Sequence, residues 1–266
     1  SSDVCSSDLD VDSTALGFSG GFPGDFIAQT LEDSNIQSDF VQVDEDTRIN
    51  VKLKSGQETE INAPGPKVTH AQFEQLLSQI RRTTKDDIVI VAGSVPNSIP
   101  SDAYAQIAQI TEKTGAQLVV DAEKDLVETV LPYRPLFIKP NKDELEVMFN
   151  TTVKSDEDVI KYGKEILKKG AQSVIISLGG DGAIYVDQHQ SIKAVNPQGH
   201  VVNTVGSGDS TVAGMVAGLS MGLNIDEAFQ QAVASGTATA FSEDLATRDA
   251  IENIKSQVTI SVLDGE

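Results

Sequence analysis

A glycine-rich run followed by an aspartate is the strongest candidate for chemistry in this sequence. Gly206-Ser207-Gly208-Asp209 precedes small and apolar residues that predict a helix. Backbone N–H groups at a helix N-terminus lack partners inside the helix and favour an anion. A carboxylate beside such an anion can accept the proton of a hydroxyl that attacks phosphorus. The run therefore predicts phosphoryl transfer with Asp209 as the base, and a tight turn feeding a packed helix is the structural alternative.

The predicted helix after this run carries glycines at a regular interval. Gly214, Gly218 and Gly222 fall four residues apart, so they would share one face of an α-helix. Glycine lowers helix propensity, which makes such a face costly unless a neighbouring element needs the space. We therefore expect this helix to approach another backbone closely.

A glycine-rich loop follows one predicted strand. Ser177 ends an apolar run, and Gly179, Gly180 and Gly182 come directly after it. Open α/β sheets bind ligands at the carboxyl ends of their strands, which makes this loop a second candidate for nucleotide binding. A hairpin turn into the apolar residues 184–186 is the structural alternative.

A polar run follows another predicted strand and begins a helix. Lys139 ends the strand, Asn141 stands where a helix N-cap is expected, and Glu144 follows three residues later. That spacing is typical of a capping box, which by itself explains the pattern. The functional interpretation is that the amide and carboxylate oxygens face hydrated Mg²⁺ and a nucleotide phosphate.

One segment departs from the alternation of strands and helices. Residues 48–54 and 57–62 alternate polar and apolar side chains around a turn with glycine, which predicts an antiparallel hairpin, a small β-lid over about residues 46–63. With a period of two, Arg48 and Lys52 share one face. That face could grip an anion, and a half-solvated strand with ordinary surface charges is the simpler alternative.

Other chemistries find less support. The step Gly163-Lys164 is followed by glutamate and has no glycine loop before it, so it is not a Walker A motif. The run from Gly206 nearly matches the dinucleotide fingerprint but has Thr211 at the third glycine position, which leaves an oxidoreductase as a minor alternative. No zinc-ligand spacing occurs among His70, His189, His200 and Cys5.

The elements that must position these residues alternate along the chain. Short apolar runs and amphipathic runs predict βα units around a parallel sheet that is covered on both faces. Thr69 with Gln72 forms a capping-box pattern before one helix, and Ser155 precedes another with an acidic first turn. The clearest strands are residues 87–92, 117–121, 136–139 and 173–177. We expect a three-layer α/β fold with a mostly parallel central sheet.

Composition argues against several classes of function. The 266 residues include 20 Lys and Arg against 40 Asp and Glu, a formal charge of −20, which would repel a nucleic-acid backbone. One cysteine, no secretory signal and no apolar run of about 20 residues favour a cytoplasmic protein without a membrane anchor. Residues 1–8 are polar and without period, and we expect a foreign or disordered leader there, with one domain over 9–266.

Taken together, the motifs resemble a known family. In this order they are similar to those of the ribokinase-like sugar kinases, phosphofructokinase B branch, and the resemblance runs from about residue 9 to residue 266. Within the branch, residues 46–52, 58–66 and 92–96 are similar to the 1-phosphofructokinase group. The family motifs stand here as Lys139-Pro140-Asn141-Lys142-Asp143-Glu144, Ser177-Leu178-Gly179-Gly180-Asp181-Gly182 and Thr204-Val205-Gly206-Ser207-Gly208-Asp209.

The resemblance implies a ribokinase-like fold and ATP-dependent phosphorylation of D-fructose 1-phosphate at its 6-hydroxyl, with ATP and Mg²⁺ as cofactors. Asp209 would be the base, and Gly206, Ser207 and Gly208 would form the anion hole. Tagatose 6-phosphate is the alternative substrate, and a catalytically dead remnant is a further alternative. The implied ligand contacts are Lys139, Asn141, Ser177, Gly179, Gly180 and Gly182 for ATP, Glu144 through water for Mg²⁺, and Arg48, Lys52, Ser94 and Asp209 for the phosphosugar.

The sequence departs from the family at its start. Family members begin with a strand and further lid strands that we do not find in this sequence, so we expect a truncated start. An exposed lid with an apolar face usually needs a partner, so we also expect a homodimer formed through the lid.

Overall fold

The computed structural model describes residue 9, residues 11–55 and residues 57–265, without the side chains of residues 52–60 and 62. The leader expected at residues 1–8 lies outside these described residues. In the described part of the chain no helix has the length and apolar character needed to cross a membrane.

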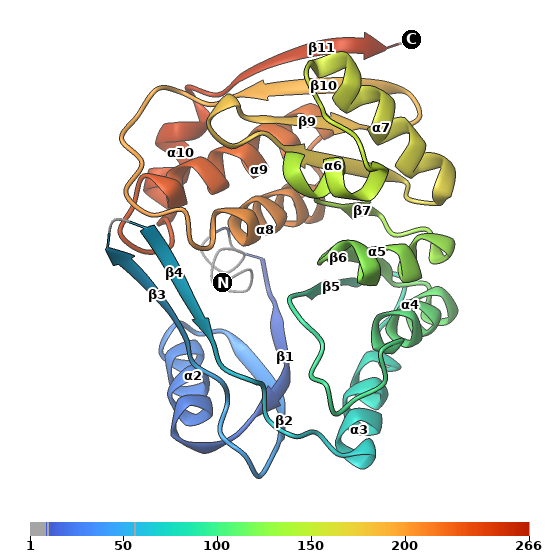
Figure 1. The fold of residues 1–266 in the computed structure, drawn as a ribbon, viewed down its shortest axis with the longest axis vertical. Helices are drawn as coiled ribbons and strands as arrows, with labels where there is room; N and C mark the ends of the chain where they lie inside the picture. The colour runs from blue at the N-terminus through green and yellow to red at the C-terminus, as the bar shows by residue number, and fades with distance from the viewer. Residues whose placement is uncertain (1–8, 10, 56, 266) are drawn as a thin grey trace.

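A central sheet of seven strands, counted over the described residues, organises the molecule (Figure 1). Its order is β11-β10-β9-β8-β7-β6-β5. Neighbours from β5 to β8 run parallel, and β9, β10 and β11 add an antiparallel edge. The strands are β5 (Ile88–Ala92), β6 (Gln117–Asp121), β7 (Phe137–Ile138), β8 (Ser173–Ser177), β9 (Ala183–Val186), β10 (Gln190–Val195) and β11 (Thr259–Gly265). All four strands predicted above are confirmed.

Helices cover both faces of this sheet, because successive strand residues point to opposite sides. Leu118 and Val120 of β6 belong to one hydrophobic core, and Val119 between them belongs to the other. The predicted three-layer fold is therefore confirmed (Figure 1). One layer contains α3 (His70–Ile80), α4 (Ala103–Thr114), α5 (Lys124–Val130), α6 (Lys142–Phe149) and α7 (Asp156–Lys169), with the short η1 (Leu131–Tyr133), and the other contains α8 (Ser207–Ser220), α9 (Ile225–Ala240) and α10 (Arg248–Lys255).

The predicted helix starts are also confirmed. Thr69 and Gln72 form the capping box of α3, in which each side chain accepts a hydrogen bond from the other residue's backbone N–H. The Ser155 hydroxyl accepts from the Asp158 N–H at the start of α7. These local hydrogen bonds satisfy donors that would otherwise be unpaired at a helix N-terminus.

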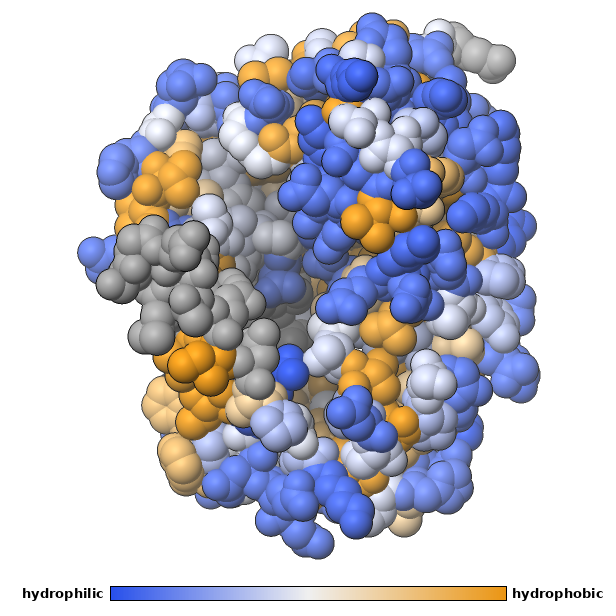
Figure 2. All heavy atoms as spheres, in the orientation of Figure 1, coloured by the Kyte–Doolittle hydropathy of each residue, from blue (hydrophilic) through white to orange (hydrophobic). Residues whose placement is uncertain are grey.

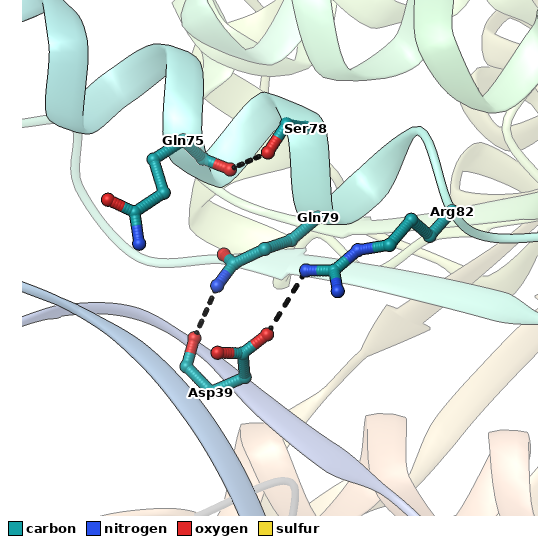
Figure 3. Close-up of polar contacts among 5 residues, drawn as sticks. All are labelled: Asp39, Gln75, Ser78, Gln79 and Arg82. Carbon is teal, nitrogen blue, oxygen red and sulfur yellow. Dashed lines mark hydrogen bonds and ion pairs between the residues drawn. The ribbon is translucent and has the colours of Figure 1, made fainter.

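A separate parallel pair lies beside the main sheet. β1 (Thr14–Ser19) pairs with β2 (Gln37–Gln42), and α2 (Gly21–Asp33) connects them. Helix α3 and the turn after it contact this pair, because Gln79 Nε2 of α3 donates to the Asp39 carbonyl at 2.8 Å and Arg82, just beyond α3, pairs with the Asp39 carboxylate at 3.2 Å (Figure 3). Side chains at the C-terminal end of α3 therefore join β2 to the rest of the molecule.

The predicted lid hairpin is present, but it begins later than expected. β3 (Asn50–Ser55) pairs antiparallel with β4 (Gln57–Asn62). Arg48 precedes β3, so it does not share a strand face with Lys52, whose side chain lies outside the described residues. The reason is that the preceding chain is tied to α2: the Gly20 N–H donates to Thr47 Oγ1, and the Thr47 N–H donates to the Gly20 carbonyl.

The predicted close approach of the glycine-bearing helix is confirmed at two of its three glycines. A β-carbon on Gly214 would lie 2.9 Å from the Ala232 Cα of α9, and one on Gly218 would lie 2.8 Å from the Ala228 Cα. Gly222 is different, because α8 ends before it and its φ of +77° places it in the following turn. The left-handed conformation, not helix packing, therefore accounts for glycine at that position.

Candidate active site

The glycine-rich run leads into α8 and forms its N-terminal turn, as the sequence predicts, and its role as an anion site stays a prediction. Gly206 is its N-cap with φ +81°, and a β-carbon there would lie 2.9 Å from Leu245 Cδ2. The Ser207 hydroxyl is buried and has no hydrogen-bond partner among the described residues. A buried hydroxyl without a partner is costly, so a ligand that supplies an acceptor here would be favoured. The positive end of the helix dipole at the same turn adds to that preference.

Asp209 lies in the first turn of α8 and is half-buried. It directly follows Gly208 in the turn that begins at Gly206. Asp209 also acts electrostatically on Asp121 at the end of β6. A carboxylate close to a phosphate held on a helix N-terminus can accept a proton from an attacking hydroxyl, and this base role of Asp209 stays a prediction.

A cavity of about 540 Å³ opens beside this helix end. Its walls come from the ends of β7 and β8, the loop after β10, and helices α8 and α9. One wall is apolar and includes Val201, Val233 and Phe241, which suits a flat ring. Of the residues predicted for the anion hole and for ATP, the cavity brings together Lys139, Asn141, Ser177, Gly179, Gly180, Gly182, Ser207 and Gly208.

The glycine loop after β8 is both a turn and a wall of this cavity. Residues Gly179–Asp181 form the short helix η2, and β9 then pairs antiparallel with β8, as the structural alternative predicted. Gly182 has φ +92°, and a β-carbon there would lie 1.9 Å from the Ala194 carbonyl oxygen. The turn therefore requires glycine at position 182.

Asn196 fixes that loop, and the sequence analysis missed it. Its Nδ2 donates to the Gly179 carbonyl at 3.0 Å, and its Oδ1 accepts from Thr237 Oγ1 of α9, also at 3.0 Å. The side chain thus joins the two walls of the cavity. Thr237, its partner on α9, is 41 residues away in the sequence, so no local pattern points to this contact. The position of Asn196 just after β10 is the one feature of the sequence that could have suggested a role in the site.

Asn141 and Glu144 form a capping box at the start of α6. Asn141 Oδ1 accepts from the Glu144 N–H and Glu144 Oε2 accepts from the Asn141 N–H, both at 2.8 Å. The structural explanation of this motif is therefore confirmed. The role of Glu144 toward Mg²⁺ stays a prediction, and it would fall to the part of the carboxylate not used in capping.

A buried ion pair lies where β6 and β7 end. Lys139 Nζ is 3.3 Å from Asp121 Oδ1, and the two side chains are 8% and 19% exposed. Burial raises the pKa of Asp121, the Lys139 ammonium opposes that rise, and the negative charges of Asp209 and Glu144 add to it. Sequence analysis singled out Lys139 but not Asp121, although Asp121 ends a predicted strand, where ligand-binding residues gather.

A second cavity, of about 600 Å³, contains two of the predicted phosphosugar residues. Arg48 and Ser94 both line it, together with residues of β1, β5, α3 and α4. Tyr104 of α4 lines it too and donates a hydrogen bond to the Gly93 carbonyl at 2.8 Å. Burial raises the pKa of Tyr104, and the charge of Asp121 adds to the rise, so Asp121 acts on groups in both cavities. In Figure 2 this face of the molecule is hollowed near its centre.

The three-layer fold, with a nucleotide-sized cavity at one helix N-terminus and a second cavity carrying an arginine, is the architecture of a kinase that acts on a small molecule. Comparison with known proteins makes this specific: residues 3–250 match the pfkB family of carbohydrate kinases, and the chain belongs to that family. It is an ATP-dependent sugar-phosphate kinase, which sets aside the oxidoreductase alternative.

Individual relatives agree with this family. The chain is 42% identical to a 1-phosphofructokinase of Bacillus subtilis (strain 168) over 253 residues, which are 95% of this chain and 84% of the relative. It is 37% identical to a D-tagatose-1-phosphate kinase of Bacillus licheniformis, over 96% of this chain and 84% of that one. A Staphylococcus aureus crystal structure, provisionally called a phosphofructokinase, is 78% identical with a TM-score of 0.92, over 100% of this chain and 87% of its own.

Proposed function

We propose that the protein transfers the γ-phosphoryl group of ATP to the 6-hydroxyl of D-fructose 1-phosphate. The observation that carries the proposal is the placement of Ser207 and Gly208, at the N-terminus of α8, in the wall of a cavity of nucleotide size, with a second cavity that contains Arg48. The similarity to a 1-phosphofructokinase supports the choice of sugar phosphate.

The chain's own residues supply three functions in this reaction. The apolar wall with Val201 and Phe241 would hold the adenine ring, while Ser207 and the N–H groups of α8 would receive the transferring phosphate. Arg48 would bind the 1-phosphate of the sugar, because a guanidinium forms paired charge-assisted hydrogen bonds with phosphate. Ser94 lines the same cavity and would help to hold the sugar.

Asp209 would take the proton in the chemical step. The 6-hydroxyl oxygen attacks the γ-phosphorus, its proton passes to the Asp209 carboxylate, and the bond from phosphorus to the bridging oxygen of ADP breaks. The proton lost by the 6-hydroxyl is then held by Asp209, and the negative charge of the broken bond is carried by ADP. The α8 N-terminus would stabilise the negative charge that develops on the transferring group.

The residues around Lys139 suit a magnesium nucleotide. Asp121 pairs with the Lys139 ammonium, and the charges of Glu144 and Asp209 reach Asp121. The described residues hold no group of three or more His, Cys, Asp or Glu that could bind a metal by itself. A hydrated Mg²⁺ that is held mainly by nucleotide phosphates needs only one or two carboxylates from the protein. When bound, Mg²⁺ would neutralise phosphate charge that these carboxylates otherwise repel. Glu144, whose carboxylate caps Asn141 of the cavity lining, is the residue that would hold its water shell.

A coupled assay of ADP release tests the proposal. Fructose 1-phosphate should give the highest kcat/KM in a panel with tagatose 1-phosphate, tagatose 6-phosphate, fructose 6-phosphate and free fructose. Free fructose should be poor because it leaves Arg48 without an anion. Efficient turnover of free fructose would contradict the assignment, and ATP binding without turnover of any sugar would identify a catalytically dead remnant.

A tagatose phosphate is the second candidate substrate. The similarity to a D-tagatose-1-phosphate kinase favours it, and a ketose 1-phosphate would present the same anion to Arg48. The two sugars differ in the configuration of one hydroxyl, so the ratio of their kcat/KM values decides between them. A ratio above about ten in favour of tagatose 1-phosphate would correspond to about 1.4 kcal/mol and would reverse the assignment.

The lid also supports a homodimer, which we propose as the working assembly. Val51 and Ile61 lie opposite each other in the hairpin and are 42% and 55% exposed. Such apolar pairs favour a covering partner. Sedimentation should show a dimer that Ile61→Lys weakens, and a monomer in the unsubstituted protein would contradict it. The cytoplasmic location expected from the sequence stays a prediction.

A further inference from the structure

The ion pair between Lys139 and Asp121 carries an inference beyond the roles given above. Lys139 lines the proposed nucleotide cavity, whereas Asp121 lies behind it at the end of β6 and pairs with its ammonium at 3.3 Å. Both side chains are largely buried. A buried ammonium needs a partner, so Asp121 is the group that makes this position of Lys139 favourable.

The ion pair of Lys139 and Asp121 lies close to the first turn of α8. A β-carbon on Gly208 would lie 3.1 Å from Lys139 Nζ and 4.0 Å from Asp121 Oδ2. Glycine at position 208 therefore leaves just enough room for the ammonium beside the helix end. A movement of Lys139 by 1 Å would change its distance to any phosphate held on that turn.

Other charged and polar groups surround the pair. Asp209 from α8 and Glu144 from α6 both act electrostatically on Asp121, and Asp121 acts in turn on the phenol of Tyr104 from α4. Without the Asp121 charge, the Lys139 ammonium would lose its ion-pair partner at 3.3 Å. A buried ammonium that has lost its partner would leave this position beside the helix end.

We propose that Asp121 is a positioning residue, which fixes the Lys139 ammonium at the α8 N-terminus. Through Lys139 it controls the rate of phosphoryl transfer. This inference rests on the proposed function, because it assigns Lys139 to the phosphate of the bound nucleotide. Asp121 itself touches neither reactant.

The experiment combines Asp121→Asn, Lys139→Gln and the double variant. Asp121→Asn keeps the size of the side chain and removes its charge, and we expect kcat to fall by about ten to a hundredfold, as small misplacements of reacting groups do. KM for the phosphosugar should change less than about threefold, because Asp121 does not line the cavity of Arg48 and reaches it only through its charge on Tyr104. Asp121→Glu restores the charge and should recover part of kcat.

The double variant distinguishes positioning from an independent effect. If Asp121 acts through Lys139, adding Asp121→Asn to Lys139→Gln should lower kcat by less than about twofold further. If kcat of the double variant instead falls by the product of the two single losses, the inference is overturned. An unchanged kcat in Asp121→Asn would overturn it as well.

A matched control tests whether the loss reflects general damage. Asp187 is also half-buried, and its carboxylate accepts hydrogen bonds from Tyr185 Oη and from the N–H groups of His189 and Gln190. It follows β9, which starts at the site and runs away from it. Asp187→Asn should therefore leave kcat within about twofold, and an equal loss in both variants would overturn the inference.

Failure of the proposed function would look different. In that case the unsubstituted protein turns over none of the sugar phosphates, and the kinetic comparison has no starting value. Titration of a fluorescent ATP analogue then serves as the readout. Asp121→Asn should bind the analogue more weakly than the unsubstituted protein does. In the Lys139→Gln background, adding Asp121→Asn should not change the affinity further. Equal affinities in the unsubstituted protein and Asp121→Asn would overturn the positioning role.

Discussion

Replacement of Gly214 by alanine tests the contact between α8 and α9, which sets the place of the proposed anion site. In an ordinary helix this change stabilises by about 1 kcal/mol, because alanine has the higher helix propensity. Here the new β-carbon would lie 2.9 Å from the Ala232 Cα, and 3.4 Å is the lower end of ordinary contact, so the helices must separate by at least 3.4 − 2.9 = 0.5 Å.

The same β-carbon would lie 2.5 Å from Ser235 Oγ, which donates to the Gln231 carbonyl at 2.9 Å. Overpacking of this kind costs about 1 to 3 kcal/mol, and loss of that hydrogen bond costs about 1 kcal/mol more. With the gain of about 1 kcal/mol in propensity, we expect Gly214→Ala to lower the free energy of unfolding by about 1 to 3 kcal/mol. The displaced α8 should also lower kcat by about threefold to tenfold.

Urea unfolding followed by circular dichroism gives the stability, and the ADP-release assay gives kcat. Gly163→Ala is the control, because Gly163 is also a helix glycine but the nearest neighbours of its β-carbon would be valine side chains, at 3.0 Å from Val186 and 3.3 Å from Val174. It should change stability by no more than about 1 kcal/mol. A Gly214→Ala protein more stable than the unsubstituted one would show that the helices are not in backbone contact.

Four further outcomes follow from the site. Asp209→Asn should lower kcat by about a hundredfold or more with little change in ATP affinity, since it removes a proton acceptor; normal turnover would exclude Asp209 as the base. Arg48→Ala should raise KM for fructose 1-phosphate at least tenfold, by about 1.4 kcal/mol of lost binding, and an unchanged KM would leave the arginine without a role. Ser207→Ala removes a buried hydroxyl that has no hydrogen-bond partner among the described residues, so it should stabilise the free protein by about 1 kcal/mol. The same change should weaken ATP binding in a titration, and tighter ATP binding would contradict the role of Ser207. Burial raises the pKa of Asp121, so this carboxylate gains its proton at a higher pH than an exposed aspartate would, and its ion pair with Lys139 is then lost. On acidification from neutral pH, kcat of the unsubstituted protein should therefore fall more steeply than kcat of Asp121→Asn. Parallel pH profiles for the two proteins would contradict this role of the Asp121 charge.

The nucleotide side of the site could be predicted because each part of it is encoded locally. The capping box of Asn141 and Glu144 spans four consecutive residues, and the Gly206 turn sits directly before its helix. Strand ends gather at one sheet edge by topology, so Lys139 and Ser177 could be expected together before any contact was known. Short-range patterns and one fold rule were sufficient there.

Contacts that depend on distant residues could not be predicted. Arg48 was expected in a strand because residues 48–54 alternate, but hydrogen bonds between Thr47 and Gly20 take this part of the chain to α2 instead. Gly222 fitted the helix spacing, and only the end of α8 shows that it belongs to a turn. The only signal at Asp121 was its place at the end of a predicted strand, because the charges that act on it come from Lys139, Asp209 and Glu144, which are distant in sequence.

The two cavities draw on separate stretches of the chain, and this has a consequence for how ligands stabilise the protein. The nucleotide cavity is lined by residues 139–241, the other by residues 16–107, and Asp121 lies between these stretches. A ligand that binds only the folded form suppresses local opening of the elements it touches. ATP should therefore slow amide hydrogen exchange mainly in the later stretch, and the phosphosugar in the earlier one. Since β6 belongs to neither lining, its exchange would report on both ligands, which makes it the natural place to measure whether the two binding events are coupled.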